Sequence, residues 1–560
     1  MKRKTIFCLI ILGIPILLAF ASNAIQMWHH VYDDAFITYR YAKNLSLGYG
    51  ITWNPGHAPT EGYTNFLLVI VLAPFIKGGI DPLLVTRVLS YFSAVAMSII
   101  IFIVAKRRYG CTTSSAMMIA SLILLAQQTR TLCLVGLETV IYAFLLLINF
   151  HVGIEFIYSR RIYSSVLFSV LIIFTMLLRP EAAFLYLAML LLYCIYRGPR
   201  QILELKPLIL GLLILLTLGG TYLVWKVLYF GHIFPNAFYI KVSNSLFISP
   251  LGIRTVFHFV SNNVLLIALS YASILFCFNG VKEHHQKSKI SILLGMALVL
   301  LYVCFFVRTD TLMDIGGRFM YPLLPILIYM SIPILASTLE VLESWTTKSV
   351  LTFSGMVFSV LLIFGPGDVL HIYGNMKLLA PNDSRKTDNS EFRIAKALST
   401  FPGIESIRIA FGDSGVIPYF TGSVWLDVVG LNDGVIARSR NKKELIDHFF
   451  HFQADIVIHP GSKDYSWINY GHGPLGDYSS WADDPRWDDY AYIGTVKTSG
   501  NIYDLQFFVR KSSSRYQTLK EFLCNNIIDG WYEPLPFHIG TWKPKKEIQP
   551  TWIPRLDLCG

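Results

Sequence analysis

Long apolar runs, separated by short clusters of Lys and Arg, fill the first two thirds of this chain. Hydrophobic residues make up 54% of the 560 residues, and only 15% are charged, whereas soluble domains carry roughly 25% charged residues. Inside a bilayer the backbone has to satisfy its own polar groups, and a helix does so. The sequence therefore predicts a polytopic α-helical membrane protein.

About eleven of these runs are candidate spans, although some are shorter than the roughly 20 residues that a helix needs to cross a bilayer. The chain shows no internal repeat, which argues against a transporter built from inverted repeats. The candidate spans are residues 5–21, 83–105, 117–126, 135–158, 166–178, 182–196, 208–228, 256–278, 290–306, 319–339 and 350–364.

The basic clusters set the expected orientation, because Lys and Arg favour the cytoplasmic ends of spans. Residues 66–76 are apolar but short, and they are expected to lie in the outer interface. The alternation places the N-terminus in the cytoplasm and the C-terminus on the outer side of the membrane. Residues 5–21 are interpreted as a retained span, with a signal peptide ending near Ala21 as the alternative. The net charge of +11 arises from these clusters, so nucleic-acid binding is rejected.

The composition changes after Gly365-Pro366-Gly367. We therefore expect a membrane domain at 1–365, including a first outer loop at 26–65, and an extracytoplasmic α/β domain at 366–560 with a Trp-rich tail. The second domain is expected to contain strands at 406–411, 424–431 and 455–459, a helix at 442–452, and a hairpin formed by 491–497 and 503–510.

The first outer loop carries the adjacent carboxylates Asp33 and Asp34. If a helix begins at Asp33, Arg40 lies two turns later on the same face. Such a group can take a proton and hold an anion, whereas the alternative is a solvated connector. The two carboxylates could also bind a divalent cation. His29-His30 is close enough to raise the same question, although an interfacial anchor is the simpler interpretation.

Further polar groups are expected at the outer ends of several spans, where ionisable residues are costly and tend to be functional. Together they suggest a polar cavity that opens outward and holds a lipid phosphate, although each cation alone could be a snorkelling anchor. Arg318 is favoured because Gly316-Gly317 before it allows close backbone approach. The groups are Arg130, Glu138, Arg179, Glu181, Lys226, Asn236, Lys241, Arg308, Asp310, Asp314 and Arg318.

The first outer loop, DDAFITYRYAKNLSLGYGITWNPG followed by EGYTNF, resembles the signature of polytopic GT-C glycosyltransferases. It is most similar to the branch that contains the terminal arabinofuranosyltransferase of mycobacterial and corynebacterial cell walls. GLET, RPE, PNAFYIK, GGRFMYPLLP, GDSGVIPYF and DVVGLND follow in the order of that branch. The resemblance covers most of residues 31–433 and ends near Ala437.

The resemblance implies transfer of a sugar from a polyprenyl-phosphate donor to a cell-envelope glycan or lipid acceptor on the extracytoplasmic face. It also implies an acidic residue of the first outer loop as acid/base. We predict Asp33 as that residue and Asp34 as its partner, with the cation question open. Donor phosphate binding is predicted for Arg318, Arg179, Arg130 and Lys241, and substrate binding for Arg40, Glu61, Tyr63, Asn65, Glu138, Glu181 and Asn236.

Two other classes of protein stay open. A transporter or flippase for a lipid-linked saccharide would need charges at the membrane midplane and symmetry between halves. A non-catalytic glycan-binding protein could use Trp481 and Trp487 with the nearby acidic residues, although a plain surface loop is the simpler interpretation. The eight cysteines show no metal-binding spacing, and Cys524 could pair with Cys559 outside the cell.

Overall fold

The computed structural model describes residues 20–21, 31–159, 161–197, 206–241, 248–278, 284–311, 314–345, 390–461, 467–468, 484–496, 504–528 and 547–548. The chain forms two compact units. The helical unit consists of Met1–Tyr32, Thr64–Gly231 and Asn244–Asn375, and the sheet unit consists of Asp33–Tyr63, His232–Ser243 and Met376–Gly560.

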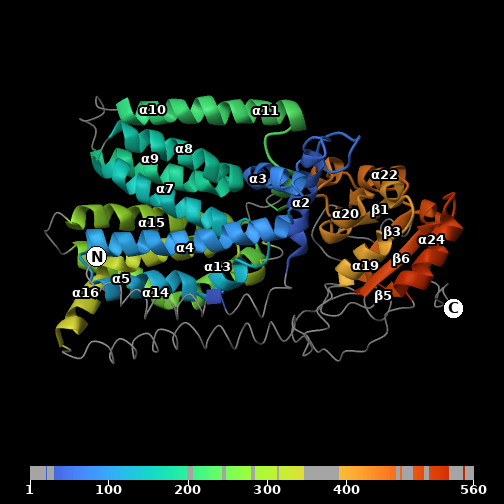
Figure 1. Ribbon diagram of the computed structural model, residues 1–560. Coiled ribbons are helices and arrows are strands. Elements are labelled where there is room, and N and C mark those ends of the chain that lie inside the picture. The colour runs from blue at the N-terminus through green and yellow to red at the C-terminus, as the bar shows by residue number, and fades with distance from the viewer. Residues whose placement is uncertain are drawn as a thin grey trace. The chain divides into compact units, whose positions relative to one another are not determined.

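Long apolar helices run side by side in the helical unit (Figure 1). Within the described residues, five helices are long and apolar enough to cross a membrane, or six if one bent pair counts as a span, and four further apolar helices are shorter. The chain is therefore a membrane protein, while the count of eleven spans stays a prediction. The helices are α3 (Phe66–Lys77), α4 (Pro82–Arg108), α5 (Thr113–Leu125), α6 (Gln127–Leu132), α7 (Thr139–Ser159), α8 (Ile162–Leu178), α9 (Ala183–Arg197), α10 (Lys206–Ile214), α11 (Gly220–Phe230), α13 (Pro250–Asn262), α14 (Val264–Phe278), α15 (His284–Phe306) and α16 (Leu324–Trp345).

Most predicted spans coincide with these helices, and α3 is short, as expected for residues 66–76. The span predicted at 256–278 is wrong in one respect, because α13 and α14 meet at a bend of 73°. The bend lies at Asn263, whose side chain donates a hydrogen bond to the Phe259 carbonyl at 2.9 Å. Residues 350–364 and nearly all of 5–21 lie outside the described residues.

The sheet unit contains the α/β domain that the sequence predicts. Strands β1 (Arg408–Phe411), β2 (Val424–Asp427) and β3 (Ile456–Gly461) are parallel, in the order β2-β1-β3. The hairpin of β5 (Tyr490–Val496) and β6 (Asp504–Arg510) extends the sheet, because β6 pairs antiparallel with β3. The remaining elements are α2 (Asp33–Ser46), α12 (Asn236–Lys241), α19 (Ser390–Leu398), α20 (Val416–Thr421), α21 (Gly434–Arg438), α22 (Lys442–Phe452), α24 (Tyr516–Leu523) and the short strands β4 (Trp467–Ile468) and β7 (Glu547–Ile548).

Local chemistry explains where these elements begin and end. Helix α22 lies where the sequence predicts it, and its N-cap Asn441 accepts hydrogen bonds from Lys443 and Glu444 N–H. The strand expected at 424–431 ends instead at Asp427, because the carboxylate of this residue binds the turn that follows.

Residues 33–63 of the predicted first outer loop belong to the sheet unit, although the sequence grouped residues 26–65 with the membrane domain. Helix α2 lies beside α20 in this unit (Figure 1). The Phe36 ring meets Phe392 of α19 and Tyr419 of α20 at centroid distances of 5.4 and 5.3 Å. Aromatic packing of this kind stabilises a contact beyond the area it buries, so α2 is fixed on the C-terminal part of the chain.

Candidate functional site

Asp33 is the first residue of α2, so Arg40 lies two turns later on the same helix, as expected. Its carboxylate oxygen Oδ1 accepts a hydrogen bond from the Val416 N–H at 2.6 Å. Val416 is the first residue of α20, which follows the turn at the carboxyl end of β1. In parallel α/β sheets, this end of the strands is where ligands bind. Asp33 is therefore held at the carboxyl end of the parallel strands, where a ligand site is expected.

Burial raises the pKa of Asp33 well above its usual range, and the nearby charges of Glu391, Asp413 and Asp34 add to this effect. The hydrogen bond from Val416 N–H opposes it. Burial, with the charge of Asp34, raises the pKa of Asp413 to about 7. A carboxylate with a raised pKa accepts a proton more readily. Asp413 can therefore take up and release a proton near neutral pH.

Arg40 lies on α2 as expected, but its guanidinium is fully engaged inside the sheet unit. It donates to the carbonyl oxygens of Trp53 (3.0 Å), Pro418 and Ser423 (2.8 Å), and to Asn54 Oδ1 (3.1 Å). The guanidinium also lies 4.5 Å from the centre of the Trp53 ring. These contacts give Arg40 a structural role, and substrate binding by Arg40 stays a prediction.

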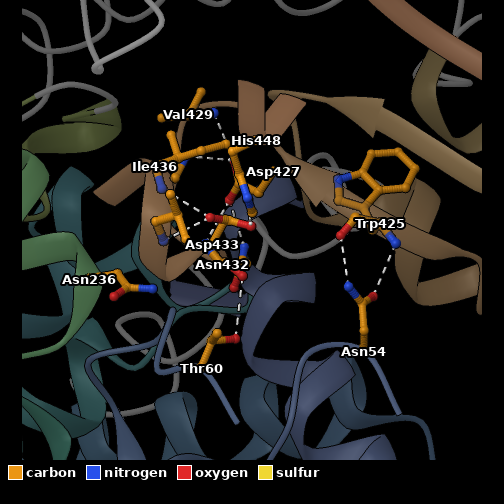
Figure 2. A network of polar contacts seen from close by, with 12 residues as sticks. Asn54, Thr60, Asn236, Trp425, Asp427, Val429, Asn432, Asp433, Ile436 and His448 are labelled. Carbon is orange, nitrogen blue, oxygen red and sulfur yellow. Dashed lines mark hydrogen bonds and ion pairs between the residues drawn. The ribbon is translucent and has the colours of Figure 1, made fainter. Parts of the chain in front are cut away.

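Later residues of the first outer loop form hydrogen bonds with the turn after β2. This turn belongs to the DVVGLND segment, residues 427–433. Asp427 binds Asn432 through its N–H and its side-chain amide, both at 2.9 Å. The Asn432 side chain accepts from Tyr41 Oη at 3.2 Å, and its carbonyl accepts from Thr60 Oγ1 at 3.3 Å. Figure 2 shows the part of this network around Asp427, Asn432 and Thr60, and it also shows Asn54 facing the main chain of Trp425.

Three predicted substrate-binding residues lie around this network. Glu61 and Tyr63 are buried, and the Tyr63 ring meets Tyr41 edge-on. Asn236 donates through its N–H to the Glu61 carbonyl at 2.9 Å, and its Oδ1 accepts from Arg438 at 3.0 Å. Lys241, predicted to bind phosphate, ends the same short helix α12. The structure thus brings these residues into one unit, while their roles in binding stay predictions.

The helical unit holds a second polar cluster. Asn65 donates to Glu138 Oε2 at 2.8 Å. Arg179 Nε lies 3.5 Å from Glu138 and 3.8 Å from Glu181, so two residues predicted to bind substrate flank one cation. Asn65, Glu138 and Arg179 are all buried. A buried charge is stable only when it is paired, and the two carboxylates supply that pairing.

Arg318 lies near Arg179, because both guanidinium groups contact the Phe319 ring, at 5.0 and 5.4 Å from its centre. Gly316 and Gly317 have φ of 70° and 69°, a conformation that favours glycine. A Cβ on Gly317 would lie 2.8 Å from Gln128 Nε2 of α6. Gly317 thus lies beside the end of the Gln128 side chain, on the helix that carries Arg130, which bonds Gln127 at 2.6 Å.

The remaining hypotheses from the sequence concern the tryptophans, the cysteines, His29-His30 and a metal site. Trp487 is buried and stacks on Tyr490 at 4.9 Å, so a sugar cannot stack on it as the glycan-binding alternative required. Cys524 is disulfide-bonded, and its partner lies outside the described residues, as do His29, His30 and Trp481. In the parts of the chain that the structure describes, no three His, Cys, Asp or Glu residues are grouped to hold a metal ion.

Sequence reasoning missed Glu391, Asp413, Gly415 and Val416 as members of the site. A signal was present, because Gly412-Asp413-Ser414-Gly415 directly follows a predicted strand, and such a turn often carries function in α/β sheets. What the pattern did not contain was the pairing of this turn with Asp33, which lies 383 positions earlier.

Comparisons with known proteins agree with this architecture. A domain of unknown function, DUF8728, matches residues 384–519. None of the curated proteins matches the chain. The chain is similar to the crystal structure of ArnT from Cupriavidus metallidurans bound to undecaprenyl phosphate, with a TM-score of 0.55 and 11% sequence identity, over 90% of this chain and 98% of that chain. The likeness at this identity is one of fold, so the chain has an ArnT-like fold.

Proposed function

We propose that this protein is a membrane glycosyltransferase that moves a sugar from a polyprenyl-phosphate carrier to a glycan or lipid acceptor of the cell envelope, on the extracytoplasmic face. The observation that carries the proposal is the ArnT-like fold over 90% of the chain, since that ArnT structure holds undecaprenyl phosphate. The motif of the first outer loop resembles that of the terminal arabinofuranosyltransferase branch. We therefore favour a pentose as the sugar of the donor.

The proposed chemistry is the transfer of a sugar from a phosphate oxygen to a hydroxyl oxygen. An acceptor hydroxyl oxygen attacks the anomeric carbon of the donor, the bond from that carbon to the phosphate oxygen breaks, and polyprenyl phosphate leaves. Asp33, when ionised, takes the proton of the hydroxyl. Arg179 and Arg318 hold the phosphate, because Arg binds phosphate oxygens through two parallel hydrogen bonds.

The state of Asp33 supports the choice of this acid over Asp34. Its oxygen Oδ1 is held by Val416 N–H, and its pKa is raised by burial and by three neighbouring acids. A carboxylate whose pKa is raised is a stronger base when it is ionised. We assign Asp34 the role of tuning the group through its charge, which acts on both Asp33 and Asp413.

The test uses the purified full chain in lipid vesicles with synthetic polyprenyl-phosphate sugars, pentose and hexose in parallel, and mass spectrometry of the released polyprenyl phosphate. Asp33→Asn keeps the size of the side chain but cannot take the proton, and it should lose about 10²–10⁴ in rate while still binding donor. Asp447→Asn, at an exposed carboxylate of the same unit, is the matched control and should keep the wild-type rate.

The outcomes separate the classes of protein. Movement of a fluorescent lipid-linked saccharide across the vesicle, without release of polyprenyl phosphate, would favour the transporter. Binding of glycan without either activity would favour a non-catalytic protein. Equal rates in wild type and Asp33→Asn would remove the catalytic role from Asp33, and a loss confined to Asp34→Asn would exchange the two roles.

A further inference from the structure

We propose that the turn at residues 412–415 positions the first-loop acid, with Gly415 leaving the space that Asp33 occupies and the Val416 N–H fixing its carboxylate. The inference rests on the function proposed above and deepens it. It makes the C-terminal domain part of the catalytic apparatus, with Gly415 as a positioning residue that touches the acid and not the substrate.

The first observation is a close approach of two backbones. A Cβ built on Gly415 would lie 2.0 Å from the main-chain oxygen of Asp33 and 2.5 Å from its Oδ1. Contacts below 3.0 Å force something to move, and one of these partners is backbone. Gly415 has a negative φ of −104°, so the reason for glycine at this position is the close approach of Asp33.

The second observation is that the turn itself is braced. Ser414 accepts a hydrogen bond from Trp425 Nε1 at 3.0 Å and donates to the Gly412 carbonyl at 3.3 Å. Both Ser414 and Val416 are buried. Because the turn is held by β2 and by the core, its N–H donor has a fixed direction.

The third observation is that α2 cannot slide away from the turn. Lys43, three turns after Asp33, donates to the Tyr419 carbonyl at 3.0 Å. Tyr419 also packs against Phe36 of α2. The acid is therefore held at its carboxylate, at its main chain and along its helix. A misplacement of about 1 Å in a reacting group can cost on the order of 10²-fold in rate.

The experiment compares Gly415→Ala with Gly430→Ala in the full chain in vesicles. A Cβ on Gly430 would also be crowded, 2.8 Å from Ile436 Cγ2, and the φ of +94° adds backbone strain. Gly430 lies in the same unit, so this variant controls for a general loss of stability. Gly415→Ala should lower kcat roughly 10–100-fold with the donor KM unchanged. Gly430→Ala should lower kcat only as far as it lowers the folded fraction, measured by thermal unfolding.

A second readout does not depend on activity. Hydrogen–deuterium exchange of the peptide that contains Val416 should speed up in Gly415→Ala and in Asp33→Ala, which removes the acceptor. It should stay slow in Asp33→Asn, whose Oδ1 still accepts. If the wild type transfers no sugar, the proposed function fails, and the exchange data still decide whether the turn holds Asp33.

Two results would overturn the positioning role. One is unchanged exchange at Val416 in Asp33→Ala, since the hydrogen bond would then not protect that amide. The other is a kcat loss in Gly415→Ala no larger than in Gly430→Ala at equal folded fraction, since the effect would then be one of packing alone. Because Asp33→Ala leaves Gly415 in place, the first result is obtained even if Gly415→Ala does not fold.

Discussion

Arg40 was predicted to bind substrate, whereas its contacts indicate a structural role. The substitution Arg40→Ala distinguishes these two roles. The substitution removes the donor to three carbonyl oxygens and to Asn54. Arg40 is only 3% exposed, so water does not replace the lost donors easily. Each buried acceptor left without a partner costs about 1–3 kcal/mol. Because relaxation offsets part of that sum, we expect a loss of about 3–5 kcal/mol in the stability of the sheet unit.

The assay is thermal unfolding of the purified chain, with donor KM measured on the folded fraction. A loss of that size lowers Tm by on the order of 10 °C for a domain of 150–250 residues. Arg40→Lys should recover little, because an ammonium group cannot reproduce the planar fork of donors. Arg486→Ala is the matched control, since its side chain is 45% exposed and surface ion pairs contribute about 0–1 kcal/mol.

The reasoning would be refuted if Arg40→Ala unfolded at the wild-type temperature. A raised donor KM in that stable variant would return Arg40 to the substrate. A lowered Tm with unchanged donor KM would establish that the cation stabilises the attachment of the first loop to the C-terminal domain.

Three further predictions follow from the site. Arg318→Ala should weaken donor binding by about 1.5–3 kcal/mol, measured by lipid titration, and Arg318→Lys should recover only part of it; full donor affinity in Arg318→Ala would move the role to Arg179. Asp413→Asn removes a charge that raises the pKa of Asp33, so the acidic limb of the rate profile should move to lower pH, and an unmoved limb would contradict the coupling. His448 bonds Asp433 at 2.9 Å, and this contact raises the pKa of His448. The stability gained from the contact is complete below the unfolded pKa of about 6.5 and is lost as pH rises through the folded pKa. His448→Gln should therefore flatten the dependence of stability on pH above about 6.5.

The sequence predicted most of the helices and strands because each depends on local periodicity. The runs at 83–105 and 135–158 became α4 and α7, and the patterns at 442–452 and 503–510 became α22 and β6. The bend between α13 and α14 escaped prediction, since a run of apolar residues is compatible with one straight span and with two short helices.

The candidate site was predicted in part for a different reason. Asp33 and Arg318 could be found because charges beside apolar runs are costly and conspicuous. Asp413 and Gly415 could not be assigned, because their role depends on a contact that no local pattern encodes. Arg40 was interpreted as a ligand for substrate because its position on α2 was predictable, whereas the carbonyl oxygens that it bonds belong to residues 418 and 423.

The edge of the sheet explains why the first outer loop belongs to the C-terminal domain. β2 is an edge strand, and an exposed edge offers unpaired N–H and C=O groups. The Asn54 side chain accepts from Trp425 N–H at 3.0 Å and donates to its carbonyl at 2.8 Å, as a neighbouring strand would. The loop thus completes a sheet whose strands are made more than 350 positions later in the chain. Since contacts so far apart in sequence form late in folding, Asp33 reaches its hydrogen bond with Val416 only after the intervening helices have been made, and an incomplete chain lacks a positioned acid.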